Sequence, residues 1–324
     1  MIRLISVSEP VLPCSPVGLG TFESRALRGF FMWRFFVCAV TGLQLRSLSL
    51  SDIRTEQHGD TMNADDYAFR FGGIERLYGR RGLEAFRQSH IAVVGLGGVG
   101  SWAAEALARS GIGIITLIDM DDVCVSNTNR QLHALEGEYG RTKTDAMADR
   151  LRAINPEADI RVHFGFLTTR NVSELITEEM TGVIDAIDSV KAKAALIAHC
   201  QRRKIPLVCA GGAGGQIDPT QIQVADLSKT TQDPLLAKVR NLLRREYGFS
   251  RNPKRRFGIE AVYSLEQLTY PAGDGEVCLQ KPATDGPVRL DCASGFGAAS
   301  PVTASFGFFA ASRLLNRIAR RANQ

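Results

Sequence analysis

The chain has 324 residues, of which 44% are hydrophobic and 23% are charged, so it can bury a sizeable core in one large or two small domains. The net charge of +5 permits an anionic partner without requiring one. Seven cysteines without a C-x-x-C pair argue against a disulfide framework and a zinc ribbon, and favour reduced thiols in a cytoplasmic protein.

The first 61 residues differ from the rest of the chain. Prolines and glycines interrupt regular structure in the first twenty positions. The apolar stretch 29–43 is too short to span a bilayer and contains Arg34. Patterned sequence begins after Met62. We therefore predict that residues 1–61 are a disordered or non-native extension, and that residues 62–324 form the functional domain.

A helix is expected at 67–86, where aromatic and basic residues alternate, with breaks at Gly72, Gly73 and Gly79. A strand–helix–strand unit follows. Residues 91–94 and 114–118 are short apolar runs of the length of buried strands. The alanine-rich segment 101–110 between them is expected to be a helix.

Glycines occupy the turn between the first of these strands and its helix. Gly95, Gly97 and Gly100 have the G-x-G-x-x-G spacing, and Gly98 lies between them. This spacing allows a tight turn, close approach of a phosphate, and close packing of helix on strand. The helix N-terminus then provides an anion site, and Asp119 after the second strand is placed for a ribose hydroxyl. The pattern predicts a nucleotide site rather than a structural turn.

Strands and helices continue to alternate as far as residue 209. The order predicts an α/β, Rossmann-like fold with a largely parallel sheet and flanking helices. Ligands of such sheets bind at the carboxyl ends of strands, where Gly95, Asp119 and Asp188 all lie. The expected elements are a helix at 142–154, a strand at 160–166, a short helix at 172–179, a strand at 182–187, a helix at 191–203 and a strand at 206–209.

The C-terminal part is less regular. The apolar helix, with only about 15 apolar residues, is too short to span a membrane, so we interpret it as a core or dimer helix; weak membrane association is the alternative. The expected elements are a strand pair at 216–226, a basic amphipathic helix at 235–247, a strand at 263–270, a small-residue loop at 293–299 and the apolar helix at 302–319.

Two cations follow the nucleotide motif. Arg130 lies in a polar loop beside Asn127, and Lys143 stands at a helix start, where its charge opposes the helix dipole. Each could equally be a solvated surface residue, but with the glycine turn they suit a triphosphate. Asp188 either binds Mg²⁺ beside the phosphates or caps the next helix. ATP with Mg²⁺ therefore fits better than a nicotinamide cofactor, and the chain has no P-loop.

These residues carry a resemblance to a known superfamily. The sequence resembles the adenylating core of ubiquitin-activating enzymes and of their bacterial relatives in thiamin and molybdopterin synthesis. That resemblance implies that Mg-ATP attaches AMP to a carboxylate. The matching segments are VVGLGGVG from Val93, LIDMD from Leu117, SNTNRQ from Ser126, Lys143, Asn155-Pro156 and DAID from Asp185.

The resemblance also implies roles for single residues. It places Asp119 at the ribose, Asp188 at Mg²⁺, and Asn127, Arg130 and Lys143 at the phosphates. In the family a further arginine crosses a homodimer to reach the ATP; Arg76 is our first candidate for it and Arg70 the second.

Other segments distinguish the branch. The sequences RFGG from Arg70, AGGAGGQIDPT from Ala210 and DCASGFGA from Asp291 resemble the tRNA threonylcarbamoyladenosine dehydratases. This implies ATP-dependent cyclisation of threonylcarbamoyladenosine beside the tRNA anticodon. The alternative is adenylation of a sulfur-carrier protein, although the zinc cysteines of those enzymes are missing. Cys278 and Cys292 could accept sulfur from a relay or cysteine-desulfurase partner, but buried structural thiols are the default.

A basic run at 235–257 is the candidate contact for RNA. It interleaves arginines with Tyr247, Phe249 and Phe257, which suits phosphates and base stacking. A solvated charged face is the equally weighted alternative. Arg202, Arg203 and Lys204 form a smaller candidate. The basic residues predicted to bind RNA are Arg244, Arg245, Arg251, Lys254, Arg255 and Arg256.

Overall fold

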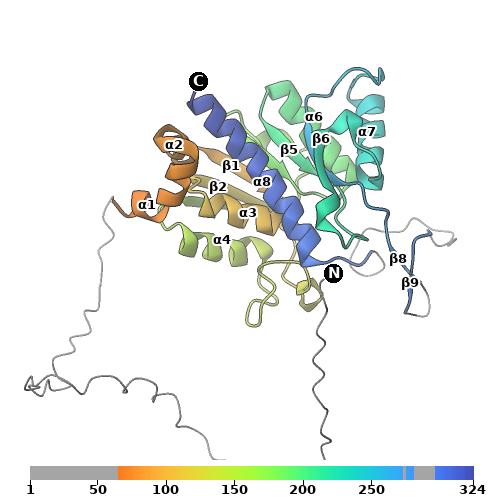
Figure 1. The fold of residues 1–324 in the computed structure, drawn as a ribbon, viewed down its shortest axis with the longest axis horizontal. Coiled ribbons are helices and arrows are strands. Elements are labelled where there is room, and N and C mark those ends of the chain that lie inside the picture. Colours follow the sequence, from red (N-terminus) through yellow and green to blue (C-terminus); the bar gives the residue numbers. More distant parts are fainter. Residues whose placement is uncertain (1–64, 273–274, 281–295) are drawn as a thin grey trace, which may run out of the picture. The chain divides into compact units, whose positions relative to one another are not determined.

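The computed structural model describes residues 65–272, 275–280 and 296–324 (Figure 1). The predictions for residues 1–61, for Cys292 and for the first part of the 293–299 loop lie outside these ranges.

A seven-stranded sheet organises the described residues, in the order β3-β2-β1-β4-β5-β7-β6. Neighbouring strands are parallel from β3 through to β7, and only β6 runs antiparallel, beside β7. The predicted α/β, largely parallel fold is therefore confirmed. The strands are β1 His90–Val94, β2 Ile114–Asp119, β3 Asp159–Phe164, β4 Gly182–Asp185, β5 Leu207–Ala210, β6 Ile222–Asp226 and β7 Glu260–Ser264; β8 Tyr270–Pro271 and β9 Val277–Cys278 form a separate pair.

Helices bury both faces of the sheet, as parallel sheets require. Helices α2, α3, α4 and α8 contribute to one core cluster, and α6 and α7 to the other (Figure 1). Strand β1 shows why, because Ile91 and Val93 belong to the first cluster while Ala92 and Val94 belong to the second. The helices are α1 Asp65–Arg70, α2 Gly72–Arg87, α3 Gly100–Arg109, α4 Lys143–Ile154, α5 Val172–Leu175, α6 Val190–Arg203, α7 Pro234–Glu246 and α8 Ser300–Ala322, with 3₁₀ turns η1 Val125–Asn127, η2 Pro219–Gln221 and η3 Leu227–Lys229.

The C-terminal helix α8 is a core helix. It packs against α3 so closely that a Cβ on Gly307 would lie 2.5 Å from the carbonyl oxygen of Val99. Its buried residues, including Phe306 and Leu314, belong to the same cluster as the first face of the sheet. Among the described residues, no helix is long and apolar enough to cross a membrane.

Several predicted elements differ from the structure. The helix expected at 67–86 is two helices, α1 and α2, and of its predicted breaks only Gly79 has non-helical φ and ψ, whereas Gly72 and Gly73 begin α2. The strand pair expected at 216–226 is only β6, because the segment before it turns through the 3₁₀ helix η2, which begins at Pro219. The strand expected at 263–270 is β7, which begins three residues earlier and ends at Ser264, followed by the separate pair β8–β9. The helix expected at 172–179 ends at Leu175.

Candidate nucleotide-binding site

A cavity of ≈ 1340 Å³ lies at the carboxyl edge of the sheet. Its wall is made by the segments that follow β1, β2, β3, β4 and β5, together with the residues before α8 and its first turn. This is the edge at which parallel sheets bind ligands. The predicted residues Gly95, Gly97, Gly98, Asp119, Arg130, Lys143 and Asp188 all line this one cavity.

The glycine turn has the geometry that its spacing predicts. Gly95 has a φ of 87°, and a Cβ there would lie 2.8 Å from the carbonyl oxygen of Ala186. A Cβ on Gly100 would lie 1.8 Å from the oxygen of Gly95, so only glycine lets α3 start this close to the turn. A Cβ on Gly97 would meet open space on the cavity wall, which leaves its backbone open to a ligand.

Asp119 closes this turn from the end of β2. One carboxylate oxygen accepts a hydrogen bond from the Leu96 amide at 2.6 Å, and the other accepts from the Asp121 amide at 2.8 Å. Each oxygen keeps further lone pairs, so the carboxylate can hold the turn and still accept from a ribose hydroxyl.

Lys143 is the first residue of α4, and its side chain is only 7% exposed. Its ammonium nitrogen lies 2.7 Å from the carboxylate of Asp121, which is 57% exposed. A buried lysine at a helix N-terminus opposes the dipole, and a single exposed carboxylate compensates it only partly. The charge is thus held in the cavity wall, where an anion can meet it.

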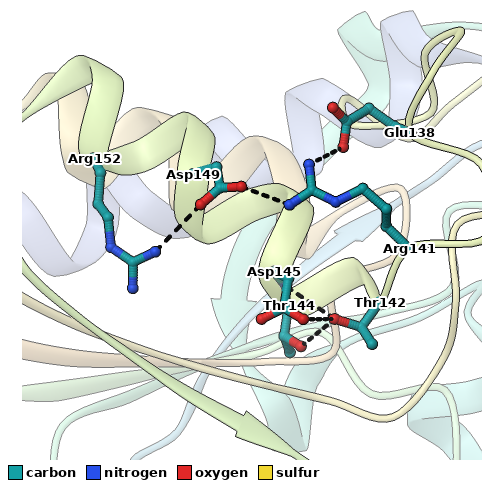
Figure 2. A network of polar contacts seen from close by, with 7 residues as sticks. All are labelled: Glu138, Arg141, Thr142, Thr144, Asp145, Asp149 and Arg152. Carbon is teal, nitrogen blue, oxygen red and sulfur yellow. Dashed lines mark hydrogen bonds and ion pairs between the residues drawn. The ribbon is translucent and has the colours of Figure 1, made fainter.

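A polar network fixes the segment before Lys143 (Figure 2). Arg141 bridges Glu138 at 2.8 Å and Asp149 at 2.5 Å, which ties the loop to the second turn of α4. The guanidinium of Arg141 lowers the pKa of the Asp149 carboxyl. The Thr142 hydroxyl accepts from the Asp145 amide at 3.1 Å and caps the helix. Lys143 therefore projects from an anchored helix start.

Arg130 lies in the loop after η1. Its guanidinium donates to the Ser126 carbonyl and to the Asn129 side-chain oxygen, both at 2.9 Å. The Arg130 carbonyl accepts from the Trp102 indole at 3.1 Å, which fixes the loop on α3. Asn127 does not line the cavity: it is 4% exposed and its oxygen accepts from the Cys124 amide at 3.2 Å. Its position supports the loop, and Asn129 is the asparagine in the wall.

Asp188 is exposed at the cavity, and its carboxylate has no hydrogen-bond or ion-pair partner in the described part of the chain. The helix-cap alternative is not seen, since α6 begins after Ser189 without a side-chain cap bond. Behind it, Lys193 donates to the Asp185 carboxylate and to the Ile187 carbonyl, both at 2.9 Å. Lys193 and Asp185 are fully buried. This pair fixes the turn that carries Asp188.

The two candidates for a crossing arginine lie away from this cavity. Arg76 is exposed on α2, and neither it nor Arg70 lines the cavity of its own chain. Arg70 donates to the Ile154 carbonyl at 3.3 Å.

The aromatic part of the RNA prediction is wrong for two residues. Phe249 and Phe257 are 7% and 4% exposed and pack edge to face at 4.9 Å in the core behind α7. They cannot stack on bases, because the apolar face of α7 needs them as core. Arg244 is half-buried with its guanidinium over Phe257, whereas Arg245, Arg251, Lys254, Arg255 and Arg256 are exposed.

The cysteines of the described residues have different surroundings. Cys200 and Cys209 are buried, and burial raises the pKa of the Cys200 thiol to about 12 and that of Cys209 further. Both are poor nucleophiles for that reason. Cys278, the candidate sulfur acceptor, is half-buried, and Cys124 is exposed.

Sequence reasoning missed several residues of the wall. Lys191 adds a third cation from the first turn of α6, and Asp121 pairs with Lys143. The loop after β5 also lines the cavity, held by Asp233 of the α7 N-terminus, which accepts from the Gly212 amide at 2.9 Å. Asp121 had a local signal, since it follows the end of β2 by two residues and belongs to the LIDMD segment.

The chain is similar to proteins of known function. The ThiF family profile matches residues 73–324. The tRNA threonylcarbamoyladenosine dehydratase of Escherichia coli K12 is 58% identical over 259 residues, which cover 80% of this chain and 97% of that protein. The enzyme of the same name from Haemophilus influenzae is 54% identical, with 79% and 96% covered.

Solved structures agree with these matches. The E. coli tRNA N6-threonylcarbamoyladenosine dehydratase TcdA in complex with ATP has a TM-score of 0.72 and 53% identity, and covers 81% of this chain and 98% of its own. The same protein in complex with AMP superposes equally well.

The E. coli molybdopterin-synthase adenylyltransferase is 37% identical over only 127 residues, about half of its length.

Proposed function

The chain belongs to the ThiF family and, within it, to the tRNA threonylcarbamoyladenosine dehydratases, and from this premise we propose that it uses ATP to dehydrate threonylcarbamoyladenosine beside the tRNA anticodon. The observation that carries the proposal is the meeting of Arg130, Lys143 and Asp188 in one cavity with the glycine turn. As an enzyme of tRNA, it would act in the cytoplasm.

The reaction needs activation of a carboxylate. The threonyl carboxylate is a poor electrophile, since its oxygen would leave as hydroxide. An oxygen of this carboxylate attacks the α-phosphorus of ATP, pyrophosphate leaves, and an acyl adenylate remains. The ureido group of the same modification then attacks the acyl carbon and loses a proton, and AMP leaves with the former carboxylate oxygen. Both reacting groups belong to one nucleoside, so proximity supplies much of the rate and no enzyme nucleophile is required.

The cations of the cavity suit the first step. Negative charge builds on the α-phosphate and on the departing pyrophosphate as the bond to phosphorus breaks. Lys143 is held almost completely buried, and a charge in such surroundings acts more strongly than one in water. Arg130 offers a planar fork that matches phosphate oxygens. Asp119 is placed for the ribose, and the residues after β3, including Phe166 and Leu167, offer an apolar wall for the adenine.

Mg²⁺ fits the donors of this cavity. Mg²⁺ usually binds one or two carboxylates together with substrate phosphates and water rather than a cage of protein ligands. Asp188 is such a carboxylate, and within the described residues no group of three or more metal-binding side chains is found. When bound, the ion would offset phosphate charge; the protein's part is to hold Asp188 in place through Asp185 and Lys193.

The tRNA and a second subunit complete the proposal. Arg245 in the last turn of α7, and Arg251 and the stretch 254–256 after this helix, are exposed and suit RNA phosphates. A homodimer would let Arg76 of one subunit reach the ATP of the other. A sulfur-relay partner at Cys278 stays a prediction without further support.

The test uses tRNA that carries threonylcarbamoyladenosine. Purified protein with ATP and Mg²⁺ should convert that nucleoside to a product lighter by one water, with one AMP and one pyrophosphate formed per product, as measured by nucleoside mass spectrometry. Lys143→Ala and Asp188→Ala should each lower the rate by about a hundredfold or more. Arg109→Ala, an exposed arginine on α3 away from the cavity, is the matched control and should keep full activity.

The sulfur-carrier alternative predicts another result. Pyrophosphate exchange that depends on a small carrier protein, and not on modified tRNA, would reverse our assignment.

A further inference from the structure

A second, smaller hollow lies next to the nucleotide cavity. It has a volume of ≈ 400 Å³ and is lined by Arg240 and Asp233 of the α7 region and by Tyr270 of β8. Two contacts join the hollows. Asp233 accepts from the Gly212 amide at 2.9 Å, and Gly212 lines the nucleotide cavity. The ring of Tyr270 packs at 5.0 Å on Phe296, which lines that cavity too.

Arg240 is the cation of this hollow. It is half-buried, and its guanidinium donates to the neutral hydroxyl of Thr230. No carboxylate pairs with it among the residues that the structure describes. Asp233 faces the same hollow and its two oxygens accept from the amides of Leu236 and Gly212, but it makes no ion pair with Arg240 in the described part of the chain. A partly desolvated guanidinium without a direct counter-ion favours a bound anion, and its fork matches phosphate oxygens.

The proposed substrate makes an RNA phosphate the natural anion. The adenosine that reacts in the nucleotide cavity is one unit of an RNA strand. The phosphodiesters on either side of it must therefore cross the rim of the cavity to join the rest of the strand. The wall formed by Gly212, Tyr270 and Phe296 is one such rim. Along the chain, Arg244 and the exposed Arg245 lie in the last turn of α7, before the exposed basic residues at 251 and 254–256.

We propose that Arg240 binds a phosphodiester of the RNA strand directly adjacent to the modified adenosine. This inference rests on the proposed function and names a subsite for it. The site selects an RNA strand over a free nucleoside, and it would hold the target adenosine in register with the ATP.

The test removes each charge of the proposed contact separately: the phosphate charge by chemical replacement and the Arg240 charge by mutation. The probe is an anticodon stem-loop RNA with threonylcarbamoyladenosine, in which single phosphates on either side of that nucleotide are replaced by neutral methylphosphonates. One of these replacements should raise the KM of the wild-type protein roughly tenfold or more. Arg240→Ala should raise the KM for the unmodified backbone by a similar factor and leave the KM for ATP unchanged. In Arg240→Ala, the methylphosphonate that raises the KM of the wild-type protein should cause no further rise in KM, because the contact is already lost.

Controls separate binding from folding and from other anions. Arg240→Lys should keep part of the affinity, and Arg109→Ala should respond to each methylphosphonate as the wild type does. Inhibition by pyrophosphate should be equal in all variants. The phosphate site would be overturned if the rises in KM from Arg240→Ala and from the methylphosphonate were fully additive. It would also be overturned if Arg240→Ala changed only the inhibition by pyrophosphate. Inactivity of the wild-type protein on the native stem-loop would instead overturn the proposed function, and the site with it.

Discussion

At the scale of single residues, His133 is buried without a hydrogen-bond partner for its ring among the described residues. It is 2% exposed, and both ring nitrogens lack a hydrogen-bond partner among the described residues. Burial, together with the charge of Lys143, lowers the pKa of His133 to about 4. The imidazole is therefore neutral in the folded protein at any pH above this value.

We expect His133 to make the protein sensitive to acid. Between pH 4 and the ordinary histidine pKa of about 6.5, the unfolded chain binds a proton that the folded protein does not, so stability falls as the pH falls through this window. The loss between pH 7 and pH 5 should be about 2 kcal/mol. His133→Leu should remove this part of the loss. Urea unfolding of both proteins at pH 7 and pH 5 measures the difference; equal pH dependence would show that His133 carries none of it.

At the scale of elements, sequence reasoning worked where the burial of a strand is visible in its own residues. Apolar runs identified β1, β2, β4 and β5 closely; every residue of β1, β4 and β5 is buried, and β2 buries Ile115, Leu117 and Ile118. The prediction placed β7 too late in the chain, because this strand begins at Glu260, a charged residue that no strand pattern favours. Two hydrogen bonds from Arg313 of α8, at 2.8 and 3.0 Å, stabilise Glu260 there. That partner lies 53 residues away and leaves no local signal.

The junction of β4 and α6 has the same character. The run Asp185 to Asp188 marked a strand end and a possible metal ligand, but nothing marked Lys193 as the partner of Asp185. Lys193 also donates to the carbonyl of Asp185, at 3.2 Å, so one ammonium holds three acceptors in the turn. Its position as the fourth residue of α6 is what brings it back over the strand end.

Lys193→Met should therefore destabilise the protein. The substitution keeps the apolar stem and leaves the Asp185 charge buried without its partner, at a cost of about 3–5 kcal/mol near neutral pH. Burial already raises the pKa of Asp185, and without the ammonium it should rise further. The folded variant then binds a proton that the unfolded chain lacks, so its stability should increase as the pH falls from neutral towards the ordinary aspartate value of about 4.

Denaturant unfolding at pH 7 and pH 5 measures both effects. Lys191→Met is the matched control, because it removes the same group from an exposed residue in the first turn of α6 and should change stability by less than about 0.5 kcal/mol. Asp185→Asn combined with Lys193→Met should recover part of the loss. A Lys193→Met protein as stable as the control would contradict the role of the pair.

At the scale of the whole molecule, the edge of the sheet was predictable and the wall around it was not. The rule that parallel strands present ligand sites at their carboxyl ends brought Gly95, Asp119 and Asp188 together correctly. Gly212 and Asn129 entered the wall through contacts with other elements, to Asp233 and to Ala298. The basic run was visible, but sequence alone could not divide it into core aromatics and exposed arginines, because that division depends on which face of α7 meets the sheet.

The subunit arrangement is the remaining prediction at this scale. Arg76 lies exposed on α2, outside its own cavity, beside the 74% exposed Leu77, and α1 carries the 92% exposed Phe69. Such apolar side chains suit an interface, which would present Arg76 to a partner. Arg76→Ala should then lower activity by about a hundredfold, and so should Lys143→Ala. In this arrangement each site takes its Lys143 from one subunit and its Arg76 from the other.

Heterodimers of these two inactive variants separate the possibilities. The variants are expressed together with different tags, and the dimer that carries both tags is purified. If Arg76 acts across the interface, one of the two sites combines the intact Lys143 of one subunit with the intact Arg76 of the other, and about half of the wild-type activity should return. If Arg76 acts within its own subunit, both sites stay defective and no activity returns. The control pairs Lys143→Ala with Asp188→Ala, two residues that line the cavity of one chain, and this heterodimer should be inactive in either case.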